Sequence, residues 1–148
     1  MGWKNLKEAF DIDRHHVIVE DGNIQIGSGF VHDLVTVDTE TGEVRQNKTF
    51  SDFLSKEYPA LERASQERIL DLIKTPDAFE NSIPVFTFRD GEIIECNCEE
   101  LGYPNVTHDG QLMYENRFSA DIEEVIAWAK RDLEAWSDML DQRKQEIE

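Results

Sequence analysis

Apolar residues separated alternately by four and three positions dominate the C-terminal part of the chain and constrain its fold most. They are Ile122, Ile126, Ala129, Leu133, Trp136 and Leu140. This spacing is a heptad seam and predicts one amphipathic helix after Ser119, of about 27 residues and about 40 Å. Two interpretations remain open. The helix packs across a sheet of its own domain, or part of its face, centred on Leu133, Trp136 and Leu140, forms a homodimer or binds a partner helix.

Residues 15–49 carry a different pattern, with short β-rich runs separated by turn residues. The runs are 16–19, 23–26, 31–38 and 43–48. Asp21-Gly22 and the stretch 39–42 supply turn chemistry, and Gly27-Ser28-Gly29 indicates a bend. We therefore expect an antiparallel β-meander.

A helical segment separates this meander from a second β region. Ser51 is an expected N-cap, and because the residue before a proline avoids the helical conformation, Pro59 divides the segment into helices at 52–57 and 60–74. Thr75-Pro76 predicts a further helical turn or two through Glu80.

Two hairpins are expected next. One covers 85–96 around Asp90-Gly91, and the other covers 106–113 around Asp109-Gly110. The predicted fold class is α+β: an antiparallel sheet of hairpins with a central helical segment and a long C-terminal amphipathic helix. We expect one acidic domain over residues 1–148.

The charge of the chain limits its partners. It contains 32 acidic and 15 basic residues, a formal net charge of −17, and the excess is spread along the sequence. Such a field repels nucleic acid and anionic membranes and attracts basic surfaces. The sequence also lacks an N-terminal apolar signal region and any apolar run of membrane-spanning length. We expect a cytoplasmic protein with a basic protein partner, and no direct binding to nucleic acid or membrane.

Residues with metal or catalytic chemistry form no recognised motif. Cys96 and Cys98 would share one face of a strand, with His108 as a third zinc ligand, but structural zinc sites place two to four residues between paired cysteines. We interpret them as ordinary strand cysteines and expect no metal or cofactor. His32-Asp33 and His108-Asp109 are neighbours that point to opposite faces of a strand, so they are not preformed acid–base pairs.

Carboxylates on an ordered scaffold can imitate the phosphates of a duplex. B-DNA carries one charge per about 1.7 Å, so the net charge of this chain corresponds to roughly 29 Å of duplex. The carboxylates that we expect to bind a partner lie on the last helix. They are Glu134, Asp138 and Asp141, with Glu123 and Glu124 as a second cluster. A solvated surface with no binding role would use the same residues.

The segment Asn105–Phe118, leading into Ala120–Arg131, resembles a pattern found in small uncharacterised proteins of bacteriophages and prophages. The resemblance implies an accessory protein of a mobile element, a class that includes acidic inhibitors of host defence nucleases, and a location in the host cytoplasm. Physically, the segment is a hairpin in which Leu112 and Tyr114, or else Met113, anchor the long helix to the sheet.

Our leading hypothesis is therefore a non-catalytic protein that inhibits a host nucleic-acid-binding protein by charge mimicry, as anti-restriction and anti-CRISPR proteins do. The first alternative is an assembly protein that acts through its C-terminal helix. The second is a small enzyme that uses its His and Asp residues.

Overall fold

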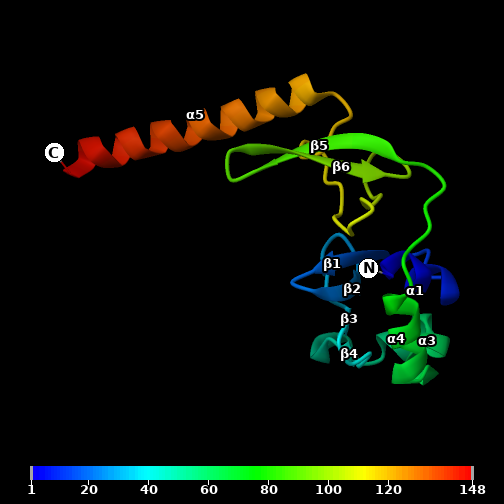
Figure 1. Ribbon diagram of the computed structural model, residues 1–148. Coiled ribbons are helices and arrows are strands. Elements are labelled where there is room, and N and C mark those ends of the chain that lie inside the picture. Colours follow the sequence, from blue (N-terminus) through cyan, green and yellow to red (C-terminus); the bar gives the residue numbers. More distant parts are fainter. Residues whose placement is uncertain (1, 148) are drawn as a thin grey trace.

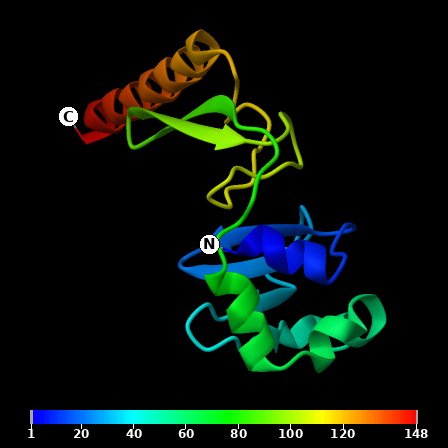
Figure 2. The same cartoon turned by 45° about the vertical axis from the view of Figure 1, so that its right-hand side comes forward.

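The computed structural model describes the backbone of residues 2–147 and the side chains of residues 2–135. Residues 2–74, the N-terminal half, contain a four-stranded sheet and short helices (Figure 1). Residues 83–147, the C-terminal half, contain a two-stranded hairpin and one long helix. The two views agree that this helix lies on the side of the hairpin away from the N-terminal half (Figures 1 and 2). The predicted α+β class is confirmed.

The four-stranded sheet is the predicted meander, with strand order β1-β2-β3-β4 and antiparallel pairs throughout. Its strands are β1 (His16–Glu20), β2 (Asn23–Gly27), β3 (Val35–Val37) and β4 (Val44–Gln46). β3 is much shorter than the expected run of 31–38. Residues 28–34 instead form a turn, in which the Ser28 N–H donates to the Val31 carbonyl over 2.8 Å.

Helices cover this sheet. They are α1 (Trp3–Ala9), α2 (Phe53–Glu57), α3 (Pro59–Arg63) and α4 (Gln66–Lys74), and the 3-10 helix η1 (Lys48–Phe50) precedes α2. The predicted single helix at 60–74 is wrong, because Ser65 starts a new helix by accepting a hydrogen bond from the Arg68 N–H over 3.1 Å. The sequence analysis also missed α1, although Trp3, Leu6 and Phe10 recur at helical spacing and are buried.

The main hydrophobic core lies between the meander and these helices. Its fully buried members include residues from α1, the sheet, α3 and α4, namely Leu6, Ile24, Ile26, Val35, Val37, Leu61 and Ile69. Burying a side chain of this size contributes about 1.5–3 kcal/mol relative to leaving it exposed. This core holds the N-terminal half together.

The hairpin of β5 (Ile83–Arg89) and β6 (Glu92–Cys98) confirms the predicted Asp90-Gly91 turn. Both turn residues have positive φ, 52° and 79°, as a two-residue turn of type I′ requires. A smaller core of Val85, Cys96, Cys98 and Met113 covers one face of the hairpin. The second predicted hairpin is reduced to isolated bridges, one of which pairs Val106 with Leu112.

The long helix is α5 (Ile122–Ile147), 26 residues and about 39 Å. Val125 is fully buried and Ala129 is 8% exposed, so its first turns are packed. Among the helices of residues 2–147, none is long and apolar enough to cross a membrane.

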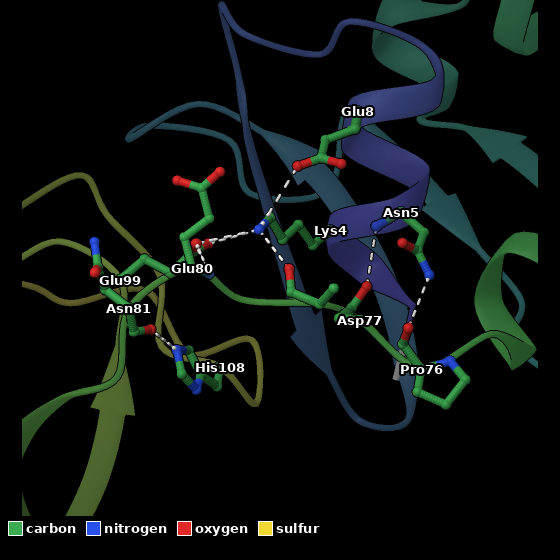
Figure 3. Close-up of polar contacts among 10 residues, drawn as sticks. Lys4, Asn5, Glu8, Pro76, Asp77, Glu80, Asn81, Glu99 and His108 are labelled. Carbon is green, nitrogen blue, oxygen red and sulfur yellow. Dashed lines mark hydrogen bonds and ion pairs between the residues drawn. The ribbon is translucent and has the colours of Figure 1, made fainter.

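The helical turn expected at 76–80 does not form. The side-chain amide of Asn5 donates to the carbonyls of Leu72 and Thr75 over 3.3 and 2.8 Å. The Asn5 N–H donates to Asp77 Oδ1 over 3.0 Å (Figure 3). These bonds hold residues 75–77 as an extended connection. It leads from α4 to the hairpin.

Candidate functional site

The two halves meet through the loop that follows β6. The Val19 N–H donates to the Gly110 carbonyl over 2.9 Å, and the Trp3 indole N–H donates to the His108 carbonyl over 2.8 Å. Gly110 has a φ of 93°, and a Cβ there would overlap the Val19 side chain. The loop therefore lies directly against β1.

Lys4 makes a second junction (Figure 3). Its ammonium donates to the Ala78 carbonyl over 2.6 Å and to Glu99 Oε2 over 3.1 Å. The same carboxylate accepts the Glu80 N–H over 3.0 Å. Although burial opposes it, these two donors hold the pKa of Glu99 below its ordinary value. These bonds thus tie α1 to the segment that precedes β5 and to the residue that follows β6.

A cavity of about 720 Å³ lies at this junction. Its lining includes the bases Lys4, Lys7 and Arg14 and a larger number of acids. Lys4 pairs with Glu99 at 3.1 Å and Arg14 with Glu57 at 2.8 Å. Because both signs are present in the lining, the cavity does not indicate one kind of ligand.

A more distinctive feature is a group of aromatic and apolar side chains beside the junction, the aromatic patch. It comprises three residues in contact, His32, Tyr103 and Tyr114, together with Phe30 and Leu101, which lie close to them in the same two loops of the sequence. The Tyr103 and Tyr114 rings stack with centroids 6.2 Å apart, and the Tyr114 hydroxyl lies 3.0 Å from His32 Nε2. Phe30 is fully exposed, and Leu101, Tyr103 and Tyr114 are 42–48% exposed. The contact between Tyr114 and His32 thus joins two loops distant in sequence, and both loops expose apolar side chains to solvent.

The loop carrying Phe30 has a defined conformation. A Cβ at Gly27 would overlap the backbone of Val31 and His32, so a glycine permits this close approach. The Ser28 hydroxyl accepts from the Val31 N–H over 3.2 Å. Beside it, a Cβ at Gly29 would come within 2.9 Å of the Tyr103 hydroxyl. The turn therefore places Gly29 against Tyr103, and the next residue, Phe30, is fully exposed to solvent.

Three exposed carboxylates accompany the residues of the aromatic patch. Glu100 and Glu115 flank Leu101 and Tyr114 in the sequence and are exposed. Glu20 lies close enough to act on Tyr114, whose pKa is raised by burial first and then by Tyr103 and Glu20. An aromatic surface bordered by acids favours basic groups, particularly Arg, which also stacks on Tyr and Phe.

The carboxylates selected from the sequence lie elsewhere, on α5. Glu123 and Glu124 occupy its first turn, where acids stabilise any helix, and Glu124 accepts a hydrogen bond from the Ser119 hydroxyl over 2.9 Å. Glu134 is exposed, about 16 Å further along the helix. Asp138 and Asp141 lie outside the described side chains. Successive residues of a helix are rotated by about 100°, which places Lys130 on the same face as Glu123 and Glu134. This face of α5 therefore carries both positive and negative side chains.

The apolar residues of α5 that were expected to form an interface also lie partly within and partly outside the described side chains. Leu133 is 55% exposed, although it follows the buried Ala129 by one turn. Trp136 and Leu140 lie outside the described side chains. The hairpin anchors are Leu112 and Met113, which are 5% and 2% exposed, while Tyr114 belongs to the aromatic patch.

The histidines are held by structural contacts. His108 stacks on Phe79 with centroids 3.8 Å apart, and its Nε2–H donates to the Asn81 carbonyl over 3.0 Å. His32 Nδ1 lies 3.4 Å from His16 Nε2. The neighbouring acid Asp109 accepts from the Thr107 hydroxyl and from Gln111. No His–Asp hydrogen bond is described among these residues.

The cysteines are buried in the second core. Cys96 and Cys98 lie on the same face of β6, as predicted, and burial raises the pKa of both thiols. Within residues 2–147, no group of three or more His, Cys, Asp or Glu side chains is arranged to hold a metal ion.

Comparison of the chain with protein-family models, with curated proteins and with solved structures finds no match in any of the three. The aromatic patch must therefore be interpreted from its own geometry. Sequence reasoning missed it because its two loops are about seventy positions apart. The one local signal is Phe30, an aromatic residue directly after Gly-Ser-Gly.

Proposed function

We propose that this protein is a non-catalytic acidic binding protein that uses the aromatic patch to dock on a basic surface of another protein, one that normally binds nucleic acid. The observation that carries the proposal is the stacked pair of half-exposed tyrosines, Tyr103 and Tyr114, with the fully exposed Phe30 directly after the glycine that faces Tyr103. Aromatic residues are enriched at interface hot spots, and a surrounding charged rim sets the choice of partner.

The net charge of the chain supports a basic partner. Exposed carboxylates border the patch and occur on both halves, among them Glu20, Glu100, Glu115 and Glu134. A surface of this sign accelerates association with a cationic surface and competes there with phosphates. The resemblance to bacteriophage and prophage proteins gives this binding a biological setting, the inhibition of a host defence protein in the cytoplasm.

An enzymatic role has less support in the described residues. His108 is fixed by Phe79 and Asn81, and the neutral, buried thiols are poor nucleophiles. Binding is therefore the function that the exposed groups favour.

The test is affinity capture from nuclease-treated bacterial lysate at about 0.1 M and about 1 M salt, where the Debye length falls from about 10 to 3 Å. The double variant Phe30→Ala/Tyr103→Ala should lose a nucleic-acid-binding protein that the wild type retains at low salt. Phe50→Ala is the matched control, because Phe50 is also exposed but lies on η1, outside the patch. Equal capture by all three proteins would remove the patch from the proposal.

A further inference from the structure

α5 is longer than the surface available to it. β5 has seven residues, which span about 23 Å, whereas the 26 residues of α5 span about 39 Å. Figures 1 and 2 show the helix continuing past the hairpin turn. Short helices in water gain most of their stability from packing an apolar face, so this extension needs a contact.

A groove opens where the hairpin ends. It has a volume of about 650 Å³ and lies between the hairpin turn and α5, with Phe88, Ala129, Leu133 and Ala135 as its apolar lining. Leu133 is 55% exposed there, and Ile93, on the neighbouring strand, is 36% exposed. Among the described side chains of α5, residues 122–135, Ala129 is thus the last buried one, while the apolar seam of the sequence continues beyond it.

The charged residues of this groove distinguish it from the rest of the molecule. They are Arg89, Asp90, Arg117 and Asp132, two bases and two acids. Arg117 lies 5.2 Å over the Phe88 ring and 3.8 Å from Asp132. The described side chains that line the groove therefore carry no net charge, on a chain whose net charge is −17.

The absence of net charge in the groove lining distinguishes between the molecules that could bind there. A strongly basic partner gains no attraction from a rim of zero net charge. Most of the acidic surface of this chain repels a second copy of it, but the groove does not. At the groove, each copy presents both positive and negative side chains to the other. Two-fold contacts between identical surfaces are the commonest way in which soluble proteins form oligomers.

We propose that α5 and the hairpin turn form a symmetric homodimer interface, in which Leu133 of each copy enters the groove of the other. The dimer is independent of the aromatic patch and does not rest on the proposed function. Because like net charges oppose association, added salt strengthens it, the reverse of the effect expected for a basic partner.

The test is sedimentation equilibrium of the full chain over protein concentrations on the order of 1 to 100 µM. Measurements are made at about 0.1 M and about 1 M salt. The wild type should reach the dimer mass within this range, at lower concentration in high salt. Leu133→Asp should weaken the dimer at least tenfold while circular dichroism and the urea midpoint stay close to the wild type, since the side chain is half exposed.

Leu101→Asp is the matched control, because Leu101 is 48% exposed but belongs to the aromatic patch. It should dimerise like the wild type. A monomer under every condition would overturn the proposal, and so would a dimer that tolerates Leu133→Asp. A monomer whose capture of another protein is lost in Leu133→Asp would assign the groove to that protein instead. If the dimer is confirmed and no basic partner is captured, only the proposed function fails.

Discussion

The Val19 N–H donates to the Gly110 carbonyl over 2.9 Å, and this bond joins the first strand of the meander to the loop that follows the hairpin. The contact permits no side chain at Gly110, because a Cβ would overlap that of Val19. Gly110 thus permits the close approach of this loop to β1, beside the contact between Tyr114 and His32.

Gly110→Ala should therefore destabilise the protein by about 2–4 kcal/mol in urea unfolding, through backbone strain and the overlap with Val19. Gly91→Ala is the control. Gly91 also has a positive φ, 79°, but a Cβ there meets nothing within 4 Å. It should lose only about 1 kcal/mol, the cost of strain alone. Equal losses for the two variants would contradict the role of the contact.

His16 predicts a pH dependence of stability. Burial, with His32 and His15 nearby, lowers its pKa from 6.5 to about 4. The unfolded chain takes up this proton at a higher pH than the folded chain. The stability from keeping the ring neutral is thus present above about pH 6.5 and lost as the pH falls towards 4.

Because the His16 ring is only partly buried, solvent screening reduces the effect, and the wild type should lose roughly 1–2 kcal/mol of its free energy of unfolding from His16 across this window. His16→Gln should show a flatter profile between about pH 6.5 and 4.5. Both proteins share the carboxylates Asp38 and Asp52, whose pKa values are lowered and which titrate below this window. Parallel profiles for the two proteins would show that His16 takes up its proton at the same pH in the folded and the unfolded protein.

The cysteines should be unreactive in the folded protein. Burial raises the pKa of Cys96 and Cys98, so at neutral pH both remain protonated and shielded. A thiol reagent should modify them only as fast as the protein unfolds, and added zinc or chelator should leave the melting temperature unchanged. Rapid labelling of the folded protein, or stabilisation by zinc, would contradict this interpretation.

The elements that were predicted correctly are those whose turn residues or apolar spacing can be recognised within a short stretch of sequence. The Asp90-Gly91 hairpin, the meander order and the long C-terminal helix follow from turn chemistry and apolar spacing. The predictions that failed depended on side chains distant in sequence or on a local cap. Asn5 keeps residues 75–77 extended, and Ser65 divides the expected helix at 60–74.

The candidate site was less accessible to prediction than the fold. The loops that carry His32 and Tyr114 meet where Gly27 permits a tight turn and Gly110 lies against β1. Net charge indicated a basic partner, but it could not locate the surface. The carboxylates of α5 were selected by helical spacing, which also places Lys130 among them.

Competition with DNA shows whether this protein occupies a surface that normally binds nucleic acid. The affinity of the captured nucleic-acid-binding protein for this chain is measured by titration calorimetry or fluorescence anisotropy, with and without duplex DNA, at several salt concentrations. We expect DNA and this protein to exclude one another, and the affinity to fall steadily as the salt concentration rises. Simultaneous binding of both, or an affinity that does not change with salt, would contradict this expectation.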